Sequence, residues 1–336
     1  MTAHQVTDHQ KPSSSFSKTI KAVEALALET FQREIESKQL YYHGIDHVEG
    51  VARRAALIFD TVVPFYGQER SNHKRSNNTD WNRQRELLQL SAIAHDMLQI
   101  FHPQASPQSL PQSPRQRRNG ESEQATIRQL FLFLKEVDTS KDISKAGTFH
   151  HFTPADISVL EEAIRATICQ YDASDSSIYQ PWLYAKHRNG KSISLVARCL
   201  ALADIGTLGI EGIEAYSKEG SLLLLEENLD IISFLKNESG LDSRFDDAFR
   251  ENVRQRLLKR ARFEVDFARG RLNRLEQELA GLPSGAIAQL KQKVFKHLTP
   301  ETIQTLEAII PTANDTALSQ LIDYFRLKRY VQEQNL

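Results

Sequence analysis

The sequence predicts an all-α protein, and two observations carry this prediction. Apolar residues recur every three or four positions along most of the chain, which is the period of an amphipathic helix. The alternation of apolar and polar residues that marks a strand is scarce. The length of 336 residues suits one large domain, or a main domain with a helical appendage.

The composition is that of an ordinary folded protein, with 40% hydrophobic and 25% charged residues. The net charge is −1, so no overall field attracts the chain to nucleic acid or to a membrane. No apolar run approaches the roughly 20 residues of a membrane span, and the polar N-terminus has no signal-peptide core. We therefore expect a cytoplasmic protein. Cys169 and Cys199 lie in apolar helical patterns without CxxC spacing, which favours buried free thiols over a disulfide.

The N-terminal part consists of a polar tail and predicted helices. Residues 1–17 include Pro-Ser-Ser-Ser and are typical of a disordered tail. Apolar residues at helical spacing then mark one helix from about Ile20 and another from Val48, with His47 at its N-terminal edge. Residues 86–99 form a predicted helix that is apolar on nearly every side and should therefore be central.

A long insertion follows at residues 102–120. It holds four of the eleven prolines together with Gln, Ser and Arg, so we expect it not to pack into a core. Two interpretations stay open, because the insertion could close over a site as a lid or be a tolerated surface loop. Further on, Thr153 followed by Pro-Ala-Asp predicts a helix start, and His150 and His151 before it are expected at the surface.

The chain divides near residue 235 into a main domain, 18–235, and a helical extension, 236–336. An apolar stripe from Phe245 to Leu279 steps by threes and fours and predicts one long helix that ends before Gly281-Leu-Pro. The stripe suits either a homodimer contact or packing on the main domain. Bases and acids alternate on the other face, which is typical of a solvated face and argues against RNA binding. The charged residues of this face are Arg254, Arg256, Lys259, Arg260, Arg262, Arg269, Arg271 and Arg274, with Glu251, Glu264, Asp266 and Glu276.

Acidic residues and an imidazole interrupt two apolar helical runs. His95 and Asp96 lie within LSAIAHDML, and Asp204 lies within LALADI. An ionised carboxylate among aliphatic neighbours is strongly destabilising unless a partner compensates it. Arg198 or Arg165 could form a salt bridge with these acids. A divalent metal is the compensator that suits two carboxylates and nearby imidazoles together.

The segment YHGIDH supplies two further imidazoles, His43 and His47. Both would share a face if they were helical, as paired zinc ligands do. Gly44 makes an irregular turn before the helix the better interpretation. We therefore expect His47, at the helix start, to be a metal ligand and His43, in the turn, to be a proton donor. The alternative for His43 is an exposed turn histidine.

The ordered set His47, His95-Asp96 and Asp204 resembles the H…HD…D signature of the HD-domain metal-dependent phosphohydrolases. The segment YHGIDH is similar to the YHNxxH element of cyclic-nucleotide phosphodiesterases, with Gly in place of Asn. The resemblance covers about residues 18 to 235 and implies an HD-domain-like helical bundle.

The resemblance also implies roles for individual residues. Asp96 would bridge to a second metal, and His43 would protonate the leaving alkoxide. Such a site suits manganese, iron, zinc or magnesium, as one or two ions. Glu123 could contact a water near the site, but an acid at a helix N-terminus, favoured by the helix dipole, is the preferred explanation. The residues that would hold the first metal are His47, His95, Asp96 and Asp204.

These features predict a phosphohydrolase, of the phosphodiesterase or nucleotide phosphatase type, acting on a small phosphorylated metabolite or nucleotide. The metal would activate water and neutralise phosphoryl oxygens. The alternative is a non-catalytic HD-scaffold regulator that binds metal or nucleotide and signals through its C-terminal helices. A helical adaptor, with structural Asp and His residues, would bind no metal. The metal signature does not set the substrate.

Overall fold

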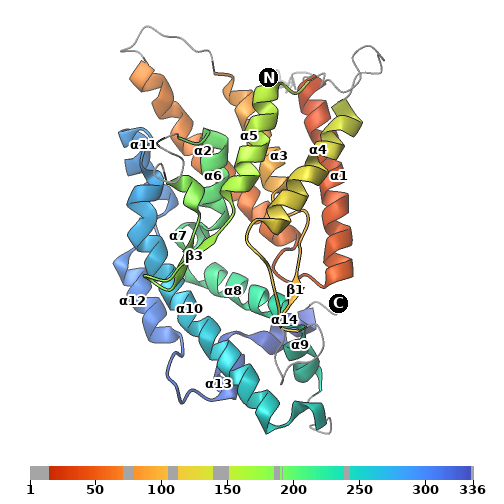
Figure 1. The fold of residues 1–336 in the computed structure, drawn as a ribbon. Coiled ribbons are helices and arrows are strands. Elements are labelled where there is room, and N and C mark those ends of the chain that lie inside the picture. The colour runs from red at the N-terminus through yellow and green to blue at the C-terminus, as the bar shows by residue number, and fades with distance from the viewer. Residues whose placement is uncertain are drawn as a thin grey trace, which may run out of the picture.

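The computed structural model describes residues 15–70, 79–104, 113–138, 151–184, 190, 192–237 and 243–333. Almost all its regular structure is helical, which confirms the all-α prediction (Figure 1). Among the described residues, strands occur only as two short antiparallel pairs. The strands are β1 (His102–Pro103) with β2 (Arg115–Gln116), and β3 (Gln170–Asp172) with β4 (Ser177–Tyr179). No described helix has both the length and the apolar character needed to cross a membrane.

The first six helices form a bundle in the upper half of Figure 1. Their bounds are α1 (Ser15–Lys38), α2 (Ile45–Arg70), α3 (Trp81–Ala94), α4 (Glu121–Asp138), α5 (Pro154–Ala166) and α6 (Leu195–Asp204). Helices α3 and α6 lie inside this bundle and contact α1, α2 and α5. Every residue of α6 from Val196 to Ala203 is buried, as is the segment from Leu90 to Ala94. The site described below lies where α3 and α6 end.

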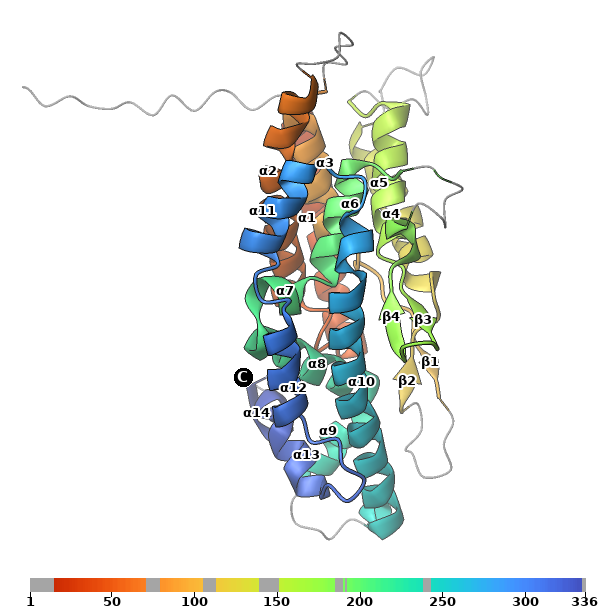
Figure 2. The same ribbon diagram turned by 90° about the vertical axis from the view of Figure 1, so that its left-hand side faces the viewer.

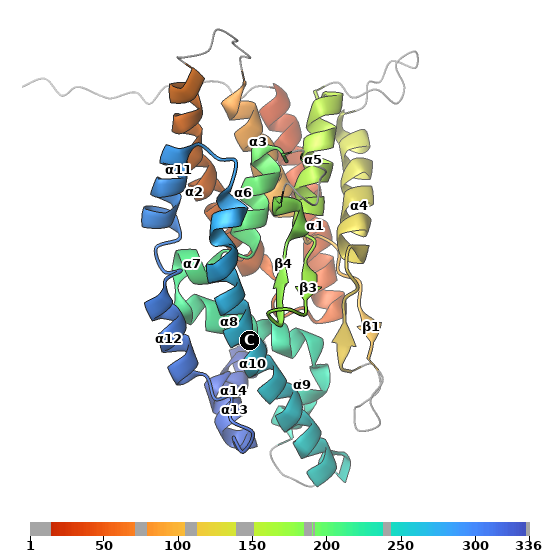
Figure 3. The same ribbon diagram turned by 60° about the vertical axis from the view of Figure 1, so that its left-hand side comes forward.

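The remaining helices lie below and beside this bundle (Figures 2 and 3). They are α7 (Thr207–Glu211), α8 (Ile213–Glu227), α9 (Leu229–Lys236), α10 (Asp247–Leu279), α11 (Ser284–Gln289), α12 (Pro300–Ile309), α13 (Leu318–Tyr324) and α14 (Leu327–Glu333). Short 3₁₀ turns lie at Pro181–Leu183 and Ser243–Phe245, and a π-helical turn at Leu290–Val294.

Helix α3 ends earlier than the sequence predicts, since it stops at Ala94 instead of continuing to residue 99. The backbone N–H groups that would have donated to helix carbonyls donate instead to side chains of other elements. The N–H of Leu98 donates to Thr126 Oγ1 at 3.1 Å, and that of Gln99 donates to Glu34 Oε2 at 3.0 Å. His95 and Asp96 therefore lie in a turn at the C-terminal end of a helix.

The predicted start of α5 is confirmed. Thr153 caps the helix and forms a capping box with Asp156, with Pro154 in the first turn. His151 is less exposed than expected, because its Nδ1 and backbone N–H both contact the buried Asp138 carboxylate. His150 lies outside the described residues. Cys169 and Cys199 are free thiols, as predicted, but only Cys199 is buried, since Cys169 follows the end of α5 and is partly exposed.

The 102–120 insertion is more ordered at its ends than the sequence suggests. Its two ends pair as β1 and β2, while residues 105–112 lie outside the described part. Ser113 Oγ donates to Asp230 at 2.8 Å, and Arg115 donates to the carbonyls of Lys38 and Glu226 at 2.7 Å. These polar contacts hold the segment without an apolar core, which is why hydropathy gave no signal.

The long helix α10 and its end before Gly281 are as predicted. Its apolar stripe packs within the chain, against β4, α12 and α13. The opposite face is not solvated throughout, because Glu264 and Arg271 are buried there. Arg271 pairs with the buried Glu278, which explains how its charge is accommodated.

Glu264 makes the stability of the fold depend on pH. Burial raises the pKa of this 1% exposed carboxyl from 4.5 to about 7, although Arg260 and Tyr324 act against the rise. The folded chain thus keeps a proton that the unfolded chain loses, so stability falls as the pH rises from about 4.5 to 7. We expect Glu264→Gln to gain roughly 3 kcal/mol of unfolding free energy over wild type across this interval. Urea unfolding of both proteins at several pH values measures this difference in unfolding free energy. A difference that stays constant with pH would contradict the prediction.

Candidate metal centre

The four residues predicted as metal ligands come together in the structure. His47 lies in the first turn of α2, His95 and Asp96 directly follow α3, and Asp204 is the last residue of α6. One ligand atom from each lies within 4.8 Å of the others, so the group could hold a metal ion. We call these four residues the His-Asp cluster.

The distances within the His-Asp cluster suit a shared cation. Asp96 Oδ2 lies 3.1 Å from His95 Nε2 and 3.4 Å from His47 Nε2. Asp204 Oδ1 lies 3.6 Å and 3.7 Å from the same two nitrogens. Ligands bound about 2.1 Å from one ion are themselves roughly 3 to 3.5 Å apart. Small movements therefore suffice to bring all four atoms onto one ion.

Hydrogen bonds from neighbouring groups orient the ligand side chains toward the centre of the His-Asp cluster. His95 Nδ1 contacts the carbonyl of Ala92 at 2.8 Å. When Nδ1 carries the proton and donates it to this carbonyl, the lone pair of Nε2 is free for a metal. Gln99 Nε2 donates to Asp96 Oδ1 at 3.1 Å, and Gln180 Nε2 donates to Asp204 Oδ2 at 3.0 Å. Such hydrogen bonds orient metal ligands in known sites.

Unsatisfied nitrogens provide a separate test of whether a metal fits. His95 Nε2 and both ring nitrogens of His47 are buried and make no hydrogen bond to the described residues. Buried polar atoms without a partner are rare in folded proteins. A cation bound to the Nε2 atoms of His95 and His47 would satisfy two of these three nitrogens and leave only His47 Nδ1, so the donor atoms present fit the group.

The local electrostatics also favour a cation. The C-terminal ends of α3 and α6, which carry partial negative charge, both lead into the cluster. Burial alone would raise the pKa of Asp96, but the His95 and His43 imidazoles outweigh it and hold that pKa well below its usual value. The His95 imidazole does so in its charged form, so on metal binding it would give up its proton and the ion would take over the stabilisation of the carboxylate.

Comparisons with known proteins give no relative. No family model, curated protein or solved structure matches this chain. The chemistry of the site is therefore inferred from its own residues.

The salt-bridge alternative with Arg198 or Arg165 is wrong. Arg198 donates to the carbonyls of Glu278 and Ala280, and Arg165 pairs with Glu161. Neither guanidinium compensates the two acids of the His-Asp cluster.

His43 is buried rather than exposed, and it lies in the turn before α2 as predicted. Its Nε2 is 3.6 Å from Asp96 Oδ2, so the ring borders the cluster. Its Nδ1 contacts Glu226 Oε1, while Glu226 Oε2 accepts the backbone N–H groups of residues 41 to 43 at 3.0 Å each. Burial raises the pKa of Glu226, but its bonds with His43 prevail and lower it below its usual value.

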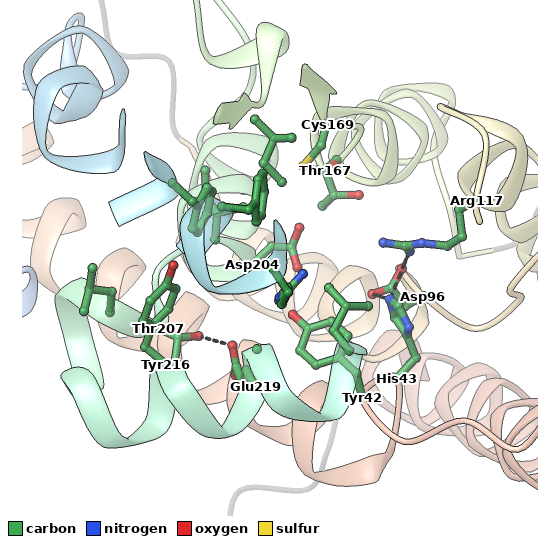
Figure 4. A pocket seen from close by; sticks show the side chains of 18 of the residues that line it. Tyr42, His43, Asp96, Arg117, Thr167, Cys169, Asp204, Thr207, Tyr216 and Glu219 are labelled. Atoms are coloured by element: carbon green, nitrogen blue, oxygen red, sulfur yellow. Dashed lines mark hydrogen bonds and ion pairs between the residues drawn. The ribbon is translucent and has the colours of Figure 1, made fainter. Parts of the chain in front are cut away.

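The sequence analysis missed Glu226 and Arg117. Glu226 follows four leucines, and an acid at the end of such an apolar run is the feature of the sequence that could have indicated a buried carboxylate. Arg117, from the 102–120 insertion, donates to His43 Nε2 at 2.9 Å and to Gln99 Oε1 at 3.0 Å. Its guanidinium is 4.0 Å from Asp96 Oδ1, and Figure 4 shows it directed at Asp96 from one side.

A cavity of about 140 Å³ opens beside these groups (Figure 4). Asp96, Asp204, His43 and Arg117 line one end of it. Glu123, in the first turn of α4, also lines it, and burial raises the pKa of this carboxyl. The other end is formed by residues of α8 and α10. A small molecule can thus reach the His-Asp cluster together with a proton donor and a guanidinium.

Proposed function

We propose that this chain is a metal-dependent phosphohydrolase of the HD-domain type, which hydrolyses a phosphate ester of a small metabolite. One observation supports this most strongly. Two buried imidazole nitrogens, which lie 3.1 Å and 3.4 Å from Asp96 Oδ2 without hydrogen-bond geometry, converge with two carboxylates within 4.8 Å at the end of a cavity. Structural carboxylates and imidazoles would instead be expected to satisfy one another by hydrogen bonds.

The His-Asp cluster would hold manganese, iron or zinc, and magnesium suits a second position beside Asp96. Such an ion supplies a water nucleophile near neutral pH and neutralises phosphoryl oxygens. Arg117 is placed to bind a further phosphoryl oxygen, since a guanidinium is well suited to phosphate. In that position the ester would replace the contact that Arg117 makes with His43.

His43 would complete the reaction. As water attacks phosphorus, the bond to the leaving oxygen breaks, and that oxygen takes a proton from His43 Nε2. Glu226 holds the other ring nitrogen and stabilises the charged imidazolium before transfer. Its bonds to three backbone N–H groups fix it in place.

Metal content and turnover together test this function. We expect protein purified without chelator to carry at least one equivalent of metal. It should hydrolyse bis-p-nitrophenyl phosphate or a nucleotide from a panel assayed with each metal added. Chelation should abolish turnover, and the metal should restore it. Metal without turnover would indicate the regulatory alternative, and absence of both would refute a metal site.

A further inference from the structure

The far end of the cavity is apolar. Ile178 of β4, Leu223 of α8 and Phe263 of α10 line it, and each is only half-buried. These three side chains belong neither to the buried core nor to the partly buried layer that packs on it. They therefore contribute to the lining of the cavity rather than to the interior.

Three aromatic rings with nearly parallel planes line this end of the cavity. Phe267 stacks with Phe263 at 6.0 Å and 14°, and with Tyr216 at 6.1 Å and 17°. Tyr216 is fixed by its hydroxyl, which donates to the carbonyl of Glu264 at 2.7 Å. At Gly220, α8 and α10 approach so closely that a Cβ would overlap the Glu264 carboxylate. These rings are thus held rigidly between two helices.

The charges nearby do not suit a second phosphate. Arg260 lines the cavity, but its guanidinium is paired with Glu264 at 3.4 Å and lies 5.5 Å from the Phe263 ring. Glu219 also lines this part and accepts a hydrogen bond from Thr207 Oγ1 at 2.7 Å. Arg260 contacts Glu264 and the Phe263 ring, and Glu219 contacts Thr207 and Arg54, so both charged groups already have partners.

We propose that this aromatic wall, formed by Tyr216, Phe263 and Phe267, binds the organic part of the phosphate ester, and that this part is flat, aromatic and uncharged. The inference rests on the proposed function for the phosphate end of the cavity. It makes α10, in the C-terminal part of the chain, a determinant of substrate specificity. Stacking on preformed rings favours planar groups over alkyl groups of the same charge.

Binding of two phosphodiester anions of equal charge tests the proposal. Diphenyl phosphate and dimethyl phosphate differ in their rings, so their affinities for manganese-loaded protein isolate the contribution of the wall. We expect calorimetry to show diphenyl phosphate binding at least about 10-fold tighter. Phe263→Ala should remove most of this preference and leave dimethyl phosphate unchanged, while Phe263→Trp should retain it.

Phe131→Ala serves as the matched control, because Phe131 is a half-buried phenylalanine of α4 that does not line the cavity. Equal affinity for the two anions, or equal weakening of both by Phe263→Ala, would overturn the proposal. Hydrolysis of bis-p-nitrophenyl phosphate is measured on the same preparations. A ring preference without turnover refutes only the proposed function, and turnover without a ring preference refutes only the wall.

Discussion

Asp96→Asn is expected to release the metal and to lower phosphodiester hydrolysis by at least about 100-fold. Asp96 Oδ2 faces both His95 and His47 within 3.4 Å, so its charge is central to the His-Asp cluster. Asparagine keeps the shape but removes the charge. Elemental analysis of the purified variant measures the metal, and initial rates with added metal measure the activity.

Asp46→Asn is the matched control for this experiment. Asp46 lies in the same segment as His47, but its side chain is 89% exposed and pairs with Lys218 at the surface. It should keep both metal and activity. Circular dichroism should show that both variants are folded. Full activity in folded Asp96→Asn would exclude the proposed hydrolytic role.

Glu226→Gln is expected to reduce kcat by roughly 100-fold to 10,000-fold while the metal content stays unchanged. The glutamine oxygen can still accept the backbone N–H groups of residues 41 to 43, so the turn should persist. Its amide nitrogen cannot accept the Nδ1 proton of His43. The imidazolium, which carries a proton on both ring nitrogens, is then disfavoured, and proton donation from Nε2 is weakened.

The readout that separates positioning from folding is the pH profile. The limb that reports the proton donor should move in Glu226→Gln, whereas KM and bound metal should not. Glu214→Gln replaces a carboxyl of the same helix that is 87% exposed and pairs with Arg326 at the surface, and it should retain the wild-type profile. An unchanged profile in Glu226→Gln would show that His43 works without this carboxylate.

Three members of the His-Asp cluster, His95, Asp96 and Asp204, could be predicted because their polarity conflicts with the surrounding apolar pattern, whereas His47 was predicted from the segment YHGIDH before a helix start. Periodicity also predicted α10 and the start of α5, since cap residues and apolar spacing are local signals. The early end of α3 was not predictable in this way. The residues after Ala94 stay buried whether they are helical or not, so hydropathy cannot register the turn.

The contribution of Arg117 was hidden for a related reason. The insertion holds several similar arginines, and nothing in composition distinguishes the one that reaches His43. That choice follows from the way Ser113 and Arg115 dock the segment on distant helices. Contacts between segments far apart in the chain decide it.

The ligand residues of the His-Asp cluster come from the ends of three helices that lie far apart in the sequence, from His47 to Asp204. An unfolded chain therefore offers no preassembled site, and an ion that occupies the cluster selects the native state by mass action. At a free ion concentration 100-fold above the dissociation constant, this linkage adds about 2.7 kcal/mol to the free energy of unfolding. A bound ion would thus stabilise the packing of α2, α3 and α6 against one another.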